Sequence, residues 1–113
     1  MQLLHFVHTA DFESDASAIP LTDDDLRTLQ KALCVNPAAG SPIRGTGGVR
    51  KIRVSIKRKG KRGGARVLYF YVTKRMTAYL LFAYDKSIAE TVSEAGKKEL
   101  RRLARLIATE EWP

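Results

Sequence analysis

Two neighbouring runs of apolar residues restrict the fold more than any other feature of this chain. Residues 65–73 and 76–84 are almost wholly apolar or aromatic, and Arg66 is the only charged residue in them. Strands that are apolar on both faces lie inside a sheet and need helices to cover at least one side. The corner between the two runs, at residues 73–75, is too short for a crossover, so we expect the two strands to pair antiparallel.

The N-terminal third predicts one strand and two helices. Residues 3–7 form a short apolar strand broken only by a histidine. Apolar residues spaced four and three apart over 12–19 indicate a weak helix that ends before Pro20. Thr22 can cap a second helix, because the three aspartates after it place negative charge where the helix dipole favours it. That helix is expected to end at Asn36, since proline disfavours helical geometry in the residue before it.

The rest of the chain predicts a loop, a further strand and a final helix. Residues 38–48 are dense in glycine and proline, as a loop is. Residues 49–57 then alternate between aliphatic and polar or charged side chains, which is typical of a strand with one buried face. A helix with one apolar stripe begins near Ser93. We therefore expect a single α+β domain over 1–113, with two N-terminal helices and one C-terminal helix on a small antiparallel sheet of the first strand and three later strands.

Charge is distributed unevenly along the chain, whose formal net charge is +8. All 12 carboxylates lie before residue 26 or after residue 84, and fourteen of the 20 lysines and arginines lie between those positions. Clustered positive charges repel one another and destabilise the fold unless a polyanion binds to them. Nucleic acid is the commonest polyanion in cells. A membrane surface is less favoured, because these cations fall in a strand and a glycine-rich segment rather than on an amphipathic helix. A basic face kept only for solubility is the remaining alternative.

Cysteine and histidine usage gives little sign of a metal site or an oxidising compartment. Cys34 is the only cysteine and falls on the leucine face of the second helix, where an inert thiol is expected. His5 and His8 fall at the first strand and are expected to be ordinary edge-strand residues. We expect no metal and no other cofactor. Without an uninterrupted apolar run of membrane-spanning length or a signal-peptide pattern, the chain is expected to be soluble and cytoplasmic.

Five residues are candidates for a site that acts on a phosphodiester. Lys51 and Arg53 are two positions apart on one strand and so project from the same side of the sheet. Arg66 begins the neighbouring strand, and Tyr84 and Lys86 end the strand after it. Such a cluster can grip a phosphate and stabilise the extra charge of a pentavalent transition state. A lysine crowded by like charges can also serve as an acid or base, and an RNA 2′-hydroxyl can serve as the nucleophile. Plain phosphate binding by the same cations is the alternative.

A second set of cations is expected to follow the backbone of RNA without reading its bases. It consists of Arg50, Lys57, Arg58, Lys59, Lys61 and Arg62, most of them in the glycine-rich hairpin loop between two strands. A solvated loop without a partner is the alternative for this segment. The aromatic residues of the apolar strands, Tyr69 to Tyr71 and Tyr79, are expected to pack in the core rather than stack on bases.

Three stretches together resemble the RelE/HigB family of toxins, most closely its HigB-like branch. They are G-T-G-G-V-R-K-I-R-V at 45–54, G-K-R-G-G-A-R-V at 60–67 and L-L-F-A-Y-D-K at 80–86. The resemblance implies a compact fold like that of microbial ribonucleases and cleavage of messenger RNA in the ribosomal A site without a metal. It also implies a cognate antitoxin protein, often with a helix-turn-helix domain.

By position, the resemblance places Lys51, Arg53 and Arg66 around the scissile phosphate, with Lys86 as the basic residue after the last strand. Two departures stand out. The family often has a further arginine where this chain has Ser87, and no tyrosine follows Tyr84 to supply the one that RelE-like members carry in the last segment. Tyr84 is the substitute candidate, and the acid and base remain unassigned.

Three functions could account for these observations. The first is a ribosome-dependent endoribonuclease that inhibits translation and growth. The second is a non-catalytic basic module that binds RNA or the ribosome. A DNA-binding regulator is disfavoured, because the second helix opens with three aspartates that would repel phosphate.

Overall fold

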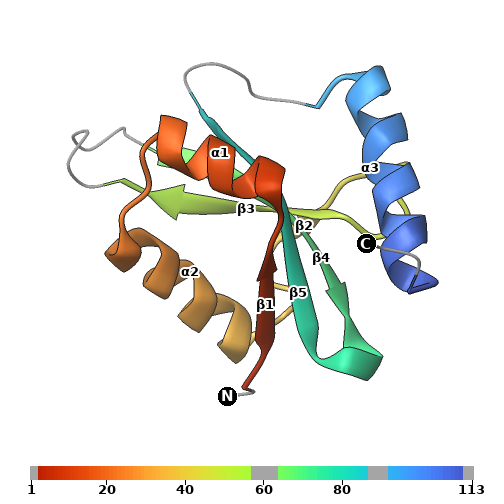
Figure 1. The fold of residues 1–113 in the computed structure, drawn as a ribbon, viewed down its shortest axis with the longest axis horizontal. Coiled ribbons are helices and arrows are strands. Elements are labelled where there is room, and N and C mark those ends of the chain that lie inside the picture. Colours follow the sequence, from red (N-terminus) through yellow and green to blue (C-terminus); the bar gives the residue numbers. More distant parts are fainter. Residues whose placement is uncertain (1–2, 57–63, 87–91, 111–113) are drawn as a thin grey trace.

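The computed structural model of the protein describes residues 3–56, 64–86 and 92–110 (Figure 1). In these ranges the elements are β1 (His5–His8), α1 (Ala10–Ala18), α2 (Asp23–Val35), β2 (Ser41–Pro42), β3 (Arg50–Ser55), β4 (Gly64–Val72), a 3-10 helix (Thr73–Arg75), β5 (Thr77–Asp85) and α3 (Glu94–Ala108). None of the helices in the described ranges combines the length and the apolar character needed to cross a bilayer.

The five strands form one mixed sheet in the order β1-β5-β4-β3-β2. The expected hairpins are present, since β4 pairs antiparallel with both β3 and β5. The prediction that the whole sheet is antiparallel is wrong, because β1 pairs parallel with β5. Parallel neighbours need a long connection, and here two helices and three strands separate β1 from β5 along the chain, so no tight turn fixes their direction. The predicted loop at 38–48 also contains β2, which pairs with β3 over only two residues.

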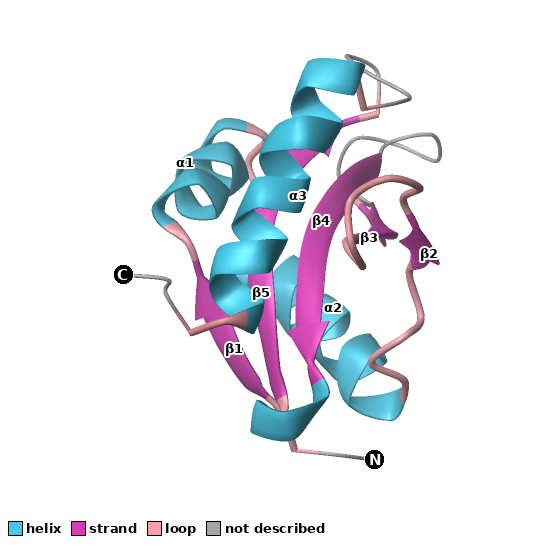
Figure 2. Cartoon of the chain, turned by 90° about the vertical axis from the view of Figure 1, so that its right-hand side faces the viewer, coloured by secondary structure: helices cyan, strands magenta, loops and turns pink. Residues whose placement is uncertain are grey.

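The sheet separates two layers of helices. Figure 2 shows α3 in front of the sheet and α2 behind it. Phe12 of α1 and Leu33 of α2 pack with Val67 on one face of the sheet. Leu68, the next residue of β4, packs with Leu100 of α3 on the other face. Because side chains alternate along β4, this strand contributes residues to the hydrophobic clusters on both faces of the sheet, as expected for a central strand.

Side-chain caps fix the starts of the N-terminal helices. The Thr9 hydroxyl accepts a hydrogen bond from the N–H of Phe12 (3.1 Å) and donates to the carbonyl of Leu80 (3.0 Å), so the start of α1 is attached to β5. The predicted Thr22 cap of α2 is confirmed as a capping box, in which Thr22 and Asp25 each accept a hydrogen bond from the other's backbone N–H. The helix ends at Val35, with Asn36 in extended geometry as predicted.

The C-terminal helix is held at its far end by the corner between β4 and β5. One guanidinium nitrogen of Arg75 donates to the carbonyl of Ile107 (2.6 Å) and another lies 3.2 Å from a Glu110 carboxylate oxygen. The guanidinium also lies over the ring of Tyr79, 5.6 Å from its centroid. The Arg75 guanidinium thus gives a backbone carbonyl in the last turn of α3 a hydrogen-bond donor, and its positive charge complements the helix dipole there. The predicted start at Ser93 is confirmed, because its hydroxyl accepts a hydrogen bond from the helix.

Tyr69 is a buried core residue, as predicted. Its hydroxyl donates to the carbonyl of Pro37 (2.9 Å) and accepts from the N–H of Gly40 (2.9 Å). A Cβ on Gly40 would lie 2.8 Å from the Tyr69 ring, so glycine is required for this close approach. Burial raises the pKa of the Tyr69 phenol, and the Gly40 hydrogen bond and the nearby Arg50 charge oppose that rise in part.

Candidate functional site

The register of the three central strands places Arg53, Arg66 and Tyr84 directly beside one another. Arg53 of β3 is opposite Arg66 of β4, which is in turn opposite Tyr84 of β5. Directly opposite residues share a face of the sheet, with Cβ atoms about 5 Å apart. Tyr84 packs with the α3 cluster, so this row of three side chains, here called the Arg53–Arg66–Tyr84 row, lies on the α3 face.

The two lysines predicted with this row flank it. Lys51 is half-buried and opposite Leu68, on the same face and one step further along β3 and β4. Lys86 is exposed, and its backbone N–H donates to the carbonyl of Gly64 (3.1 Å), so pairing continues just past the end of β5. Lys86 itself lies one residue past the end of β5. Four of the five predicted residues, Lys51, Arg53, Arg66 and Tyr84, therefore lie on one face of the sheet, and Lys86 follows directly after β5.

Arg50 lies away from this region. It alternates with Lys51 and so faces the α2 side, where its guanidinium donates to the carbonyls of Gly40 (2.7 Å) and Ala38 (3.3 Å). These hydrogen bonds attach the segment before β2 to β3, so this contact of Arg50 is structural. Binding of RNA by Arg50 stays a prediction. The other residues of the predicted RNA-tracking set, Lys57, Arg58, Lys59, Lys61 and Arg62, lie outside the described residues.

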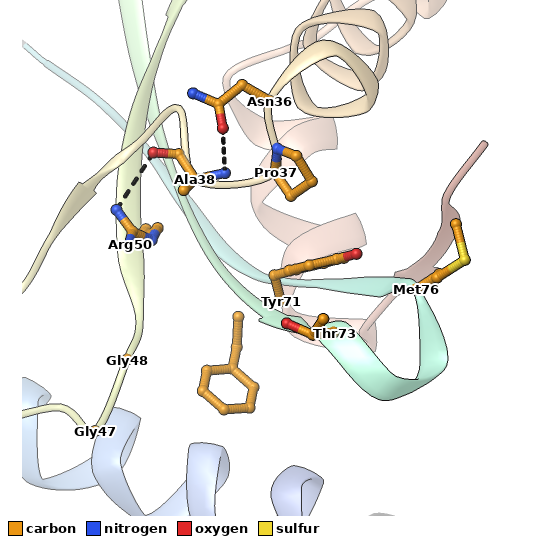
Figure 3. Close-up of a pocket in the computed structure, with 10 residues that line it drawn as sticks. Asn36, Pro37, Ala38, Gly47, Gly48, Arg50, Tyr71, Thr73 and Met76 are labelled. Atoms are coloured by element: carbon orange, nitrogen blue, oxygen red, sulfur yellow. Dashed lines mark hydrogen bonds between the residues drawn. The ribbon is translucent and has the colours of Figure 1, made fainter. Parts of the chain in front are cut away.

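A cavity of about 770 Å³ lies at the other end of β4 from Arg66 (Figure 3). Figure 3 shows Arg50 at one side of this cavity with Asn36, Pro37 and Ala38, and Tyr71 and Met76 at the other. Among the described residues that line it, Arg50 is the only cation, and its guanidinium already donates to two backbone carbonyls. The cavity is therefore poorly suited to bind a phosphate, in spite of its size.

A smaller cavity of about 300 Å³ lies beside the Arg53–Arg66–Tyr84 row, between the sheet and the first half of α3. Leu68, Phe82 and Tyr84 line it from the sheet, and Val92, Gly96, Glu99 and Leu100 line it from the helix side. Sequence reasoning did not single out Glu99 or Gly96. The available signal was the isolated glycine at position 96 inside a helical pattern, where glycine is less favourable than alanine.

Glu99 is the acidic residue among the described residues that line this smaller cavity. Its two oxygens accept hydrogen bonds from Nε (2.8 Å) and a terminal nitrogen (2.7 Å) of Arg102. The hydrogen bonds from Arg102 lower the pKa of Glu99, so the group is ionised at neutral pH. Tyr84 lines the same cavity, and its phenol oxygen is buried.

The histidines lie at the edge of the sheet, away from the row. His5 is exposed, and the ring of His8 packs edge-on against Phe12 with 5.4 Å between centroids. In the part of the chain that the structure describes, no three residues among His, Cys, Asp and Glu lie together as metal ligands would. The Arg53–Arg66–Tyr84 row offers two cations and a phenol, which can hold a phosphodiester and stabilise charge that develops on it.

The fold and the row together define a small α+β protein with two arginines and a tyrosine aligned on one face of its sheet. A family model described as the RelE toxin of the RelE / RelB toxin-antitoxin system matches residues 8–111, and the protein belongs to this family.

Two solved structures share the fold. A double arginine-to-alanine variant of the E. coli toxin RelE in the free state superposes with a TM-score of 0.54 at 13% identity, covering 91% of this chain and 97% of the other. The isolated E. coli RelE toxin gives a TM-score of 0.50 at 16% identity, covering 89% and 99%. The predicted RelE-like α+β fold is thereby confirmed.

Proposed function

We propose that this toxin-family protein, from the HigB-like branch, cleaves messenger RNA on the ribosome and thereby stops translation and growth. The observation that carries the proposal is the Arg53–Arg66–Tyr84 row, with Lys51 beside it on the same face and Lys86 directly after β5. Charged groups brought together in this way repel one another unless an anion is bound, which is the arrangement expected of a site for a phosphodiester.

Arg53 and Arg66 hold the scissile phosphate in this proposal. A guanidinium offers several N–H donors in a fixed fork that matches phosphate oxygens, and it stays protonated in proteins. The two arginines therefore stabilise charge and do not carry protons. The groups left to move protons are the Lys51 and Lys86 ammonium groups and the Tyr84 phenol, and their assignment as acid and base stays open.

The reaction uses the RNA's own nucleophile. The 2′-hydroxyl oxygen attacks the adjacent phosphorus, and the bond from phosphorus to the 5′-oxygen of the next nucleotide breaks. A base accepts the proton of the 2′-hydroxyl, and an acid delivers a proton to the departing 5′-oxygen. The products are a 2′,3′-cyclic phosphate and a 5′-hydroxyl end, and the protein cations supply the charge stabilisation without a metal or other cofactor.

The partners follow from this reaction and from the family. The message and the ribosomal RNA around the A site form the polyanionic surface that meets the basic segment between residues 26 and 84. A cognate antitoxin protein with a helix-turn-helix domain restrains the toxin. The toxin acts in the cytoplasm as one domain over residues 1–113.

A non-catalytic module that binds RNA or the ribosome is the second candidate. Two sequence departures favour it, because Ser87 replaces a further arginine and no tyrosine follows Tyr84. Such a module would bind phosphate through the same cations but would leave messages intact.

Induction of the chain in a bacterial host separates the two candidates. We expect growth arrest together with new message ends inside coding regions, and we expect those ends to vanish when translation initiation is blocked. Soluble expression with intact messages would refute the nuclease and support the binding module.

A further inference from the structure

The end of β5 that carries Tyr84 extends beyond the neighbouring strand β1. Pairing between the two strands runs only from Thr77 to Leu80, whereas β5 continues to Asp85. On its other edge β5 stays paired with β4 as far as Asp85, and there Tyr84 is directly opposite Arg66. In the described part of the chain, the segment of β5 that enters the Arg53–Arg66–Tyr84 row is therefore paired with a strand along one edge only.

Side chains of the α1 region contact the other edge of β5, where β1 has ended. The Thr9 hydroxyl, at the start of the helix, donates a hydrogen bond to the carbonyl of Leu80 (3.0 Å). Further along α1, the Asp15 carboxylate accepts a hydrogen bond from the backbone N–H of Ala83 (2.9 Å). The edge of β5 is therefore hydrogen-bonded up to the residue that directly precedes Tyr84.

Asp15 lies on the side of α1 that faces the core, where a carboxylate is uncommon. It is half-buried, and Phe12 and Ala16 on the same side of the helix belong to one hydrophobic cluster with Ala83. Placing a charged group there costs free energy unless a hydrogen bond compensates, and aspartate is also a weaker helix former than alanine. The hydrogen bond to the Ala83 N–H supplies that compensation, and a carboxylate makes a stronger acceptor than a neutral group.

We infer that Asp15 is a positioning residue for cleavage, which fixes the end of β5 through the Ala83 N–H and so holds Tyr84 in line with Arg66. The inference rests on the proposed function, since it assumes that the row holds the reacting phosphate. The α1 cluster and the Tyr84 cluster lie on opposite faces of the sheet, so Asp15 acts through the backbone of β5 and not on the RNA. A displacement of about 1 Å at a reacting group can lower a rate about a hundredfold.

Three variants of α1 test the inference. Asp15→Ala removes the acceptor, and α1 should still form because alanine is the better helix former. Asp15→Asn keeps an acceptor oxygen at nearly the same position, but a neutral acceptor makes the weaker hydrogen bond. Glu13→Ala is the matched control, because Glu13 is an exposed carboxylate of the same helix.

Hydrogen exchange and cleavage are measured on each folded variant. We expect Asp15→Ala to speed exchange of the Ala83 amide while the amide of Leu33, buried in α2, keeps its wild-type protection. The same variant should lower the single-turnover cleavage rate on saturating ribosomes by about tenfold to a hundredfold and leave ribosome affinity unchanged. Asp15→Asn should recover part of the rate and part of the Ala83 protection, and Glu13→Ala should match the wild-type protein.

A double variant separates positioning from a general effect on stability. The change Asp15→Ala is also made in the Arg66→Ala protein, in which the alignment of Tyr84 with Arg66 no longer exists. If Asp15 acts through that alignment, its loss should lower the cleavage rate much less in this background, because effects within one network do not add. An equal fold-change in both backgrounds would show a role in stability alone and overturn the inference.

The remaining outcomes distinguish this inference from the proposed function. A wild-type cleavage rate in either folded Asp15 variant overturns the positioning role but leaves the nuclease. A fall in ribosome affinity with an unchanged single-turnover rate does the same, because it would place Asp15 in binding. Absence of cleavage by the folded wild-type protein overturns the proposed function and the positioning role with it.

Discussion

Replacing Arg66 by alanine removes one of the two guanidinium groups in the Arg53–Arg66–Tyr84 row. Arg66 is in the middle of that row, with Arg53 on one side and Tyr84 on the other, so no neighbouring side chain can take its position. A pre-positioned donor that meets charge developing in the transition state contributes about 10²–10³ in rate, or about 2.7–4 kcal/mol. We therefore expect Arg66→Ala to slow single-turnover cleavage on the ribosome by two to three orders of magnitude.

The fold should tolerate this change. Arg66 is only half-buried, and its guanidinium donates to the carbonyl of Ala65 at 3.3 Å. A surface substitution of this kind changes the free energy of unfolding by about 0.5 kcal/mol or less. Arg66→Lys keeps the charge but loses the forked donor geometry, so an intermediate rate is expected.

Arg27 provides a matched control for the loss of an arginine. It is exposed on α2, on the other side of the sheet, and pairs with Asp24 at 2.8 Å. Such pairs contribute about 0–1 kcal/mol, so Arg27→Ala should fold and cleave like the wild-type protein. The reasoning is refuted if folded Arg66→Ala cleaves as fast as Arg27→Ala, because the row would then not hold the reacting phosphate.

Three further predictions address other parts of the molecule. Tyr84→Phe keeps the ring in the cavity lining and removes the phenol; a proton-transfer role requires a large fall in cleavage rate and a changed pH profile, whereas a packing role leaves both near the wild-type values. Because burial raises the pKa of Tyr69, its phenol stays protonated in the folded chain at a pH where the unfolded chain has lost that proton. The free energy of unfolding should thus be steady below about pH 10 and fall above it, and urea titrations at about pH 9 and about pH 11 should show a smaller fall for Tyr69→Phe. Neutralising Lys59, Lys61 and Arg62 should weaken ribosome binding and flatten its salt dependence by about one phosphate contact for each charge, which binding measured over a salt series would detect; an unchanged slope would show that these cations are idle.

Those parts of the fold that depend on local chemistry could be predicted from the sequence. Thr22 and the aspartates after it define the start of α2 without reference to any other segment, and the proline after Asn36 defines its end. Alternation over β3 likewise separates Lys51 and Arg53 from the aliphatic residues between them. Because the hairpin partner begins near Arg66, the same alternation was enough to bring the three cations together.

The features that sequence reasoning missed depend on contacts between distant segments. The parallel pairing of β1 with β5 is fixed by packing across the whole chain, and the two residues of β2 are too few to form an alternating pattern. Arg50 looked like any other cation in a basic run, and its bonds to the carbonyls of residues 38 and 40 arise only when that loop folds against β3. Glu99 and Gly96 looked like residues of an ordinary solvated helix, because the cavity they line exists only once α3 packs on the sheet.

The central claim is that the row positions a phosphodiester for attack by its own 2′-hydroxyl on the ribosome. The most direct test is cleavage of a message on ribosomes with a vacant A site, comparing an all-ribose message with one that carries a single 2′-deoxynucleotide immediately 5′ of the cut. We expect ribosome-dependent cleavage of the first message, with a cyclic phosphate at the new end, and no cleavage of the second at that position. Cleavage of the deoxy-substituted message at an equal rate would contradict the account, because the nucleophile would then have to come from elsewhere.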